Sequence, residues 1–249
     1  MSGHSKWSSI KHKKGAADAK RGALFTKLAR GITIAARDGA DPAGNAALAL
    51  AIQKAKDSSM PKDNIERAVA KGSGLDKYAA TVEEVVYEGY GPAGVALLIH
   101  CYTDNRNRTG ADVRSILSKN GGSLGEPGSV AYVFEKKGSV VVEASAASED
   151  DLMVAIDAGA EDIVEDGDHF EVVSDPHDFV AVRAAIEDAG IEIASADIIQ
   201  RPKTRVEVED KDAAKVFRVI ELLDDNDDVN DVAANFEVSD AALEALAAS

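Results

Sequence analysis

Cysteine, aromatic residues and long apolar runs are all scarce in this chain of 249 residues. The single cysteine, Cys101, excludes an internal disulfide, as is typical of proteins from a reducing compartment. The most apolar run, 93–99, is too short to cross a bilayer, and residues 1–30 lack the apolar segment of a secretory signal. We therefore expect a soluble, cytoplasmic protein with no membrane partner.

Signals for catalysis are also missing. The phosphate-binding pattern G-x-x-x-x-G-K-[ST] does not occur. Cys101 falls in an apolar segment, where a cysteine is typically a small buried hydrophobe. The histidines are scattered along the chain at His4, His12, His100, His169 and His177. A metal site at His4 and His12 needs two further ligands, which the sequence does not offer. We expect no enzyme activity, no metal, no cofactor and no small-molecule substrate.

The acidic run 224–231 needs a separate test as a calcium loop. Aligned from Asp224, it offers oxygen ligands at positions 1, 3 and 5. Position 6 is then Val229 where the motif needs glycine, and position 12 is Asn235 where it needs a bidentate glutamate. The run is therefore interpreted as a solvated turn between a helix and a strand.

Charge is distributed unevenly along the chain. Residues 1–77 hold 15 Lys/Arg and 7 Asp/Glu, a net charge of +8. Residues 78–249 hold 13 Lys/Arg and 37 Asp/Glu, a net charge of −24. Such asymmetry indicates an anion-binding part joined to an acidic remainder that keeps the protein soluble.

The basic part has a helical pattern. A helix over 16–37 is predicted by an apolar stripe at Leu24, Leu28, Ile32 and Ala35. A cationic sector lies beside that stripe and contains Lys20, Lys27, Arg30 and Arg37. The pair Asp41-Pro42 predicts the start of a second helix, and a third runs from near Pro61 to Gly72.

The remainder alternates between strands and helices. We predict strands at 82–90, 95–102 and 128–134 around a helix at 109–120. A β-α-β-β-α-β unit follows, with strands at 139–143, 162–165, 169–173 and 193–199 and helices at 149–158 and 179–189. The tail predicts a strand at 204–208, a helix at 212–223 and a strand at 229–237.

These elements predict an α+β fold of three domains. The first is a small basic helical domain at 1–77. Neither the segment before the β-α-β-β-α-β unit nor the tail makes a complete sheet alone, so both are expected to form one discontinuous α/β domain, 78–136 plus 203–249. A ferredoxin-like α/β domain, 137–202, is then inserted in it.

The beginning of the chain is the first candidate nucleic-acid-binding surface. Eight cations stand against Asp18 alone in residues 1–30: Lys6, Lys11, Lys13, Lys14, Lys20, Arg21, Lys27 and Arg30. Such a density favours phosphate contact over a merely solvated face. His4 and Trp7 offer flat rings for stacking on bases, although a tryptophan also packs commonly into a core.

A second candidate patch lies where a strand passes into a helix, at Asp104, Asn105, Arg106, Asn107, Arg108 and Thr109. Asn107 or Arg108 is expected to cap or precede the helix, and Arg106 and Arg108 suit phosphate groups. The alternative is a polar loop held together by Asp104 and Asn105, which the residues alone slightly favour.

Five segments together resemble the YebC/PmpR family, which includes the mitochondrial translational activator of cytochrome c oxidase: "GHSKWSSIKHKK", "MPKDNIERAVAKGSG", "YEGYGPAGVALLIHCYTDNRNRT", "GGSLGEPGSVAYVF" and "NFEV". The resemblance covers nearly the whole chain. It implies three domains, a helical one and two α/β domains with one inserted in the other. It also implies that His4, Ser5, Lys6, Trp7, Lys11, His12, Lys13 and Lys14 contact nucleic acid, and that 104–109 is functional. Gly110 and Ala111 depart from it, since bulkier residues are expected there.

Members of that family are described as transcriptional regulators that bind promoter DNA, or as ribosome-associated factors that ease translation through proline-rich stretches. The resemblance therefore implies a non-enzymatic regulator of gene expression. Its partner is promoter DNA, or else ribosomal RNA within the ribosome. The alternative from another class is a protein-interaction scaffold in which the basic segment is only solvated.

Overall fold

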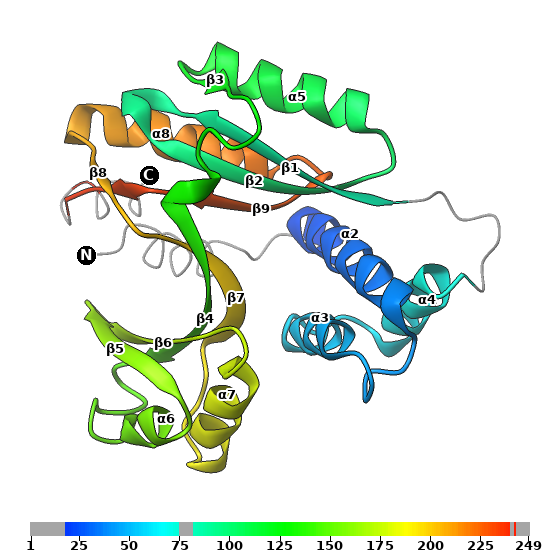
Figure 1. The fold of residues 1–249 in the computed structure, drawn as a ribbon, viewed down its shortest axis with the longest axis vertical. Helices are drawn as coiled ribbons and strands as arrows, with labels where there is room; N and C mark the ends of the chain where they lie inside the picture. The colour runs from blue at the N-terminus through cyan, green and yellow to red at the C-terminus, as the bar shows by residue number, and fades with distance from the viewer. Residues whose placement is uncertain (1–17, 75–81, 240–241, 243–249) are drawn as a thin grey trace. The chain divides into compact units, whose positions relative to one another are not determined.

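The computed structural model describes residues 18–74, 82–239 and 242, apart from the side chains of 18–20. It is an α+β protein with an N-terminal helical region and two four-stranded antiparallel sheets, an α+β class that the sequence predicts (Figure 1). The described residues form two compact units. One holds 132–208 and 235–242, and the other holds 18–131 and 209–234, each with the gaps stated above. No helix in this described part is both long and apolar enough to cross a membrane.

The helical region contains α2 (Asp18–Ala35), the short 3-10 helix η1 (Ala36–Asp38), α3 (Ala46–Asp57) and α4 (Lys62–Gly72). Its core is formed by Leu28, Ile32, Ala36, Leu48, Ala55, Met60, Ile65 and Ala68. Leu28 and Ile32 confirm the predicted apolar stripe. Leu24 does not, because it is 43% exposed.

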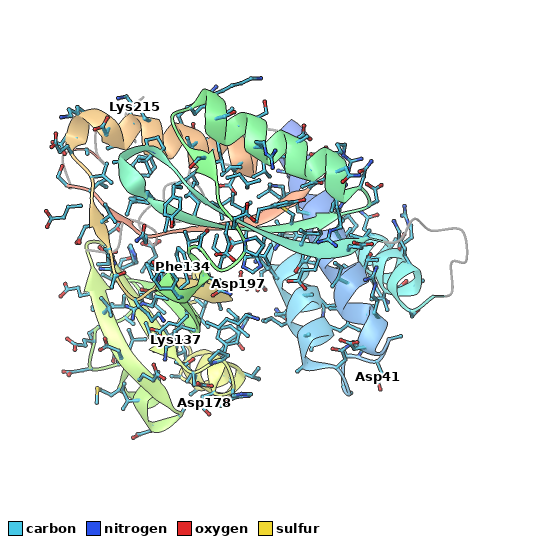
Figure 2. All side chains as sticks on the ribbon, turned by 45° about the horizontal axis from the view of Figure 1, so that its top comes forward. Asp41, Phe134, Lys137, Asp178, Asp197 and Lys215 are labelled. Carbon is cyan, nitrogen blue, oxygen red and sulfur yellow. The ribbon has the colours of Figure 1, made fainter. Side chains whose placement is uncertain are left out.

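The predicted start of the second helix at Asp41-Pro42 is wrong. Asp41 lies in the turn before α3 (Figure 2), and the helix begins after Asn45. The Asn45 side-chain oxygen accepts from Leu48 N at 3.0 Å, and its amide donates to the carbonyls of Ala35 (2.7 Å) and Gly39 (2.9 Å). One asparagine thus satisfies the end of one helix and the start of the next, which fixes the boundary.

The first sheet has the order β3-β1-β2-β9. Strands β1 (Glu83–Tyr90) and β2 (Ala96–Thr103) form an antiparallel hairpin around the 3-10 turn η2 (Pro92–Gly94). Strand β9 (Val229–Ala234) pairs with β2 although more than 120 residues separate them. Helices α5 (Arg106–Lys119) and α8 (Asp210–Asp224) lie side by side on one face of this sheet (Figure 1).

The predicted strand 128–134 is wrong. Only β3 (Ser123–Leu124) joins the sheet here, and the chain then forms a loop and the 3-10 helix η3 (Ala131–Val133). The loop is held by the Glu88 carboxylate, which accepts from the backbone N–H groups of Gly128 (2.6 Å), Val130 (2.7 Å) and Ala131 (2.8 Å). Because these donors point at one side chain, they are not available to a neighbouring strand.

The ferredoxin-like unit is confirmed. It contains β4 (Phe134–Glu143), α6 (Met153–Asp157), β5 (Ala160–Asp166), β6 (His169–Ser174), α7 (Phe179–Asp188) and β7 (Ser195–Pro202). All neighbouring strands are antiparallel, in the order β5-β6-β4-β7. The helix predicted over 149–158 is shorter than expected. Its first residues form a turn in which the Ser148 hydroxyl donates to Asp151 at 2.6 Å.

The strands of the tail differ from those that the sequence predicts. Residues 229–237 form β9 and then β10 (Phe236–Glu237), divided at Asn235. Strand β10 pairs in parallel with β8 (Val206–Glu207), which is shorter than the predicted 204–208. The division of the chain into three domains at the predicted boundaries stays a prediction.

Candidate nucleic-acid interface

Most of the predicted contact residues at the start of the chain lie outside the described residues: His4, Ser5, Lys6, Trp7, Lys11, His12, Lys13 and Lys14. The backbone of Lys20 lies in the first turn of α2, and its side chain is not described. Arg21 is exposed on the same helix. Both residues therefore stand at the end of α2 that directly follows the cationic segment 11–14.

The rest of the cationic sector, which is Lys27 and Arg30 on α2 and Arg37 on η1, contacts the sheet region instead. Lys27 Nζ donates to the carbonyl of Asp224, and Arg37 Nη2 donates to the carbonyl of Val82. Arg30 Nη1 donates to the carbonyl of Tyr102 at 3.3 Å and also to that of Asp227. The cationic sector thus donates to carbonyl groups at the end of α8, in the loop after it, in β2 and just before β1.

Asp228, at the end of that loop, is the centre of these contacts. Its side chain is only 5% exposed. Oδ1 accepts from Arg30 Nη1 at 2.8 Å, and Oδ2 accepts from Arg108 Nη2 and the Thr109 hydroxyl, both at 2.7 Å. The Thr103 hydroxyl lies 2.8 Å from that of Thr109 and 3.3 Å from Oδ2. One carboxylate therefore connects α2, β2 and α5.

The surroundings of Asp228 determine its charge. Burial disfavours the ionised carboxylate, but the hydrogen bonds from Arg108 and Thr109 and the positive charges of Arg30 and Arg108 outweigh burial. Together they hold the pKa of Asp228 below its ordinary value. The carboxylate is ionised at neutral pH and neutralises two arginines that would otherwise be available to phosphate.

The second candidate patch divides between two sides of α5. Asn105 caps the helix by accepting from Arg108 N at 3.1 Å, so the cap predicted at Asn107 or Arg108 is wrong, and the helix begins two to three residues earlier. Arg108 Nη2 also donates to Asp104 at 2.9 Å. Asn105, Arg108 and the buried Thr109 thus hold the loop and the helix together, as the polar-loop alternative predicts.

An acidic hollow of about 510 Å³ lies on the Arg108 side of the helix. Arg30 and Arg108 line it together with five aspartates: Asp104, Asp112, Asp225, Asp227 and Asp228. With more carboxylates than cations, this hollow repels phosphate groups.

Arg106 and Asn107 lie on the other side, in what we term the α5 groove. This hollow of about 580 Å³ is formed by the outer face of α5 with Tyr87 and Leu124. Arg114 also lines it, and no aspartate or glutamate does. The same short motif therefore contributes one arginine to an acidic hollow and another to a cationic groove.

The environment of Cys101 is that of a buried hydrophobe, as its apolar segment predicts. Cys101 is fully buried, and burial raises the pKa of its thiol to about 12, which leaves it protonated at neutral pH. Within the described ranges, no three His, Cys, Asp or Glu side chains are grouped to hold a metal ion.

Two stretches match enzyme motifs by their letters alone. Gly121–Gly125 fits G-x-S-x-G, but its serine lies in the two-residue strand β3 and not at a strand-to-helix elbow. Gly89–Gly94 fits G-x-G-x-x-G, but it connects antiparallel strands and opens no α-helix. Neither stretch has the backbone that its motif requires.

The sequence did not predict the roles of three residues. Asp228 was indistinguishable from the other aspartates of its run, because its arginine partners are distant in sequence. Glu88 gave no signal for the loop that it anchors. Arg114 had one usable signal, since it lies seven residues after Asn107 and so on the same helix face.

Comparison with known proteins covers nearly the whole chain. Residues 5–75 match the model of the TACO1/YebC protein N-terminal domain, and residues 82–236 match that of the TACO1/YebC second and third domain. A protein of Rubrobacter xylanophilus, named "probable transcriptional regulatory protein", is 53% identical, covering 99% of this chain and all of its own. One of Acidothermus cellulolyticus with the same name is 54% identical, covering 98% of this chain and 99% of its own.

A solved structure agrees with these matches. The crystal structure of a conserved hypothetical protein from Aquifex aeolicus matches this fold with a TM-score of 0.84 and 43% sequence identity. The match covers 93% of this chain and 96% of that one. Both family models and the relatives are matched in chain order from the helical region to the tail, and the chain belongs to the TACO1/YebC family.

Proposed function

We propose that this protein is a non-enzymatic, cytoplasmic regulator of gene expression that binds nucleic acid through the basic start of the chain. The contact residues are His4, Ser5, Lys6, Trp7, Lys11, His12, Lys13, Lys14, Lys20 and Arg21, with Lys27 and Arg30 behind them. The observation that carries the proposal is the segregation of charge, +8 in residues 1–77 against −24 in the remainder. The names of the relatives support a regulatory role.

The contacts of α2 support a division of labour within this surface. Lys27 and Arg30 already donate to acceptors of the sheet region, so in the proposal they orient α2. Phosphate contact then falls to the cations that precede them. Because counterion release depends on local cation density, this short segment suffices despite the net charge of −16.

The nucleic acid is proposed to be promoter DNA, because the relatives are named probable transcriptional regulatory proteins and regulators of transcription commonly act at promoters. The competing ligand is ribosomal RNA, with the protein acting on translation of proline-rich stretches. Cross-linking in living cells followed by sequencing of the bound nucleic acid separates the two. Enrichment of promoter DNA supports the first role, and enrichment of ribosomal RNA supports the second. Recovery of neither above an uncross-linked sample overturns the proposal.

A protein-interaction role has one specific observation in its favour. The outer faces of α6 and α7 expose four large apolar side chains: Met153, Val154, Ile156 and Val180. Acidic residues accompany them along the chain at Glu149, Asp150, Asp151, Asp157 and Asp178. This surface suits a partner protein with an apolar centre and a basic rim. Met153→Glu with Val180→Glu is expected to abolish co-purification of that partner and to leave nucleic-acid binding intact.

A further inference from the structure

We propose that the α5 groove binds the phosphodiester backbone of a nucleic-acid strand, as a second contact separate from the start of the chain. This inference rests on the proposed function and deepens it, because it places part of the ligand on the acidic portion of the protein. The groove lies within one compact unit of the structure, between the outer face of α5 and Tyr87.

The charge of the groove is the first argument. The chain carries 44 Asp/Glu against 28 Lys/Arg, yet this hollow is lined by two arginines and no carboxylate. Arg106 and Arg114 are eight residues apart, which is about 12 Å along a helix axis. They therefore suit two separate phosphate groups of one extended strand better than a single small anion. Guanidinium groups bind phosphate oxygens through paired N–H donors.

Both arginines are available to a ligand. Arg106 Nε lies 3.9 Å from Glu83 Oε2, and their side chains are 66% and 53% exposed. An exposed pair at this distance contributes at most about 1 kcal/mol and is readily exchanged for phosphate. Arg114 is exposed and makes no ion pair with any residue in the described part of the chain. Arg108, by contrast, is held by Asp104 and Asp228.

Neutral polar groups complete the surface. Asn107, Ser115 and Ser118 line the groove beside the arginines. Amides and hydroxyls of this kind commonly bind the phosphate and sugar oxygens of nucleic acids. Tyr87 presents its ring at one side, and its hydroxyl donates to the carbonyl of Arg106 at 2.9 Å. The ring is thereby fixed against the first turn of α5.

Two small residues keep the groove open. One face of the helix carries Asn107, Ala111, Arg114 and Ser118. The small side chain of Ala111 leaves space between Asn107 and Arg114. At Gly110 an added Cβ atom would lie 3.2 Å from Tyr87 Oη and 3.4 Å from its Cε1. Glycine costs about 1 kcal/mol relative to alanine inside a helix. The close Tyr87 ring explains why that cost is accepted here and why bulkier residues are absent.

The first test measures binding of the full-length protein to fluorescent single-stranded RNA and DNA of one sequence by anisotropy. The double variant Arg106→Glu/Arg114→Glu is expected to bind at least tenfold more weakly at physiological salt. Its plot of log affinity against log salt is expected to be shallower by about 1.4, because each lost phosphate contact on a single strand lowers the slope by about 0.7. The RNA and DNA arms identify which polymer the groove takes.

The matched control reverses two exposed cations of α8, Lys215→Glu/Arg218→Glu. It makes the same change of net charge in the same compact unit and outside the groove. Affinity within twofold of wild type is expected. An equal loss in the control and in the groove variant shows a general charge effect and overturns the inference.

The second test is site-specific cross-linking. The photoreactive amino acid p-benzoylphenylalanine replaces the exposed Ser118 at the end of the groove or, as a control, the exposed Ala214 of α8. A cross-link to nucleic acid from position 118 and none from 214 is expected. If wild type binds while position 118 does not cross-link, or while the groove variant binds as wild type does, the inference is wrong and the proposed function stands. If wild type binds neither polymer, the inference is wrong, and cross-linking in living cells then decides the proposed function by itself.

Discussion

Arg30 Nη1 lies 2.8 Å from Asp228 Oδ1, and this ion pair joins the helical region to the end of a strand almost two hundred residues further along the chain. Arg108 reaches the other oxygen of the same carboxylate at 2.7 Å. The contact fixes α2 against the sheet that carries α5.

Asp228→Asn is expected to destabilise the protein by about 2 kcal/mol, the order of magnitude for charged hydrogen bonds lost at a buried partner. The substitution removes the charge that compensates Arg30 and Arg108. Urea unfolding measures the change. The control is Asp227→Asn, where the side chain is exposed and a change below about 0.5 kcal/mol is expected. Equal stability of the two variants would contradict the central role of Asp228.

Acid is expected to weaken the same contact. The folded-state pKa of Asp228 is lowered, so its stabilising contribution is complete above the unfolded value of about 3.9 and is lost as the pH falls below it. As the pH falls below about 4, wild type should therefore lose stability more steeply than Asp228→Asn. Unfolding curves across that range measure both slopes. Parallel slopes would show that Asp228 titrates normally.

Glu88→Gln is expected to loosen the loop before β4. Burial disfavours the Glu88 carboxylate, but three backbone N–H donors outweigh burial and lower its pKa. A glutamine offers one acceptor oxygen, so the loss is expected to be about 1–3 kcal/mol. Amide hydrogen exchange should accelerate at Gly128, Val130 and Ala131. Exchange at these amides should be unchanged in Glu126→Gln, whose side chain is exposed in the same loop.

Alanine substitution is expected to change the stability of the protein in opposite directions at two helix glycines. At Gly72 a Cβ atom would lie 2.2 Å from the carbonyl oxygen of Thr33, which forces α4 away from α2. Gly72→Ala should therefore destabilise by about 2 kcal/mol or more, as overpacking does. Gly22 has no atom within 4 Å of the added Cβ, so Gly22→Ala should stabilise α2 by up to about 1 kcal/mol. Thermal unfolding of both variants tests the packing of the two helices, and a stabilised Gly72→Ala would contradict it.

The sequence predicted the helices and the long strands well because their signals are local. The spacing of Leu28 and Ile32 identified α2, and the alternation of elements identified the ferredoxin-like unit. The errors occurred where a distant side chain decides the local structure. Asn45 satisfies two helix ends and displaces the predicted start at Asp41, and Glu88 takes the N–H donors of the predicted strand 128–134.

The candidate surfaces show the same limit. Charge counting identified the basic start of the chain, but it could not distinguish Arg106 from Arg108. Their difference depends on Asp228, which reaches α5 only because β9 pairs with β2. The α5 groove likewise depends on the strand that brings Tyr87 beside Gly110.

The most direct measurement of the central claim compares two triple variants for nucleic-acid binding. Lys11→Glu/Lys13→Glu/Lys14→Glu reverses three cations of the basic start, and Lys54→Glu/Lys56→Glu/Lys62→Glu reverses three exposed lysines of the helical region. Both change the net charge equally, so general repulsion affects them alike. At physiological salt, the first is expected to lose DNA or ribosome binding while its circular dichroism spectrum and melting temperature match wild type, and the second is expected to bind. Unchanged binding by the first variant would contradict the claim that this protein holds nucleic acid by the start of its chain.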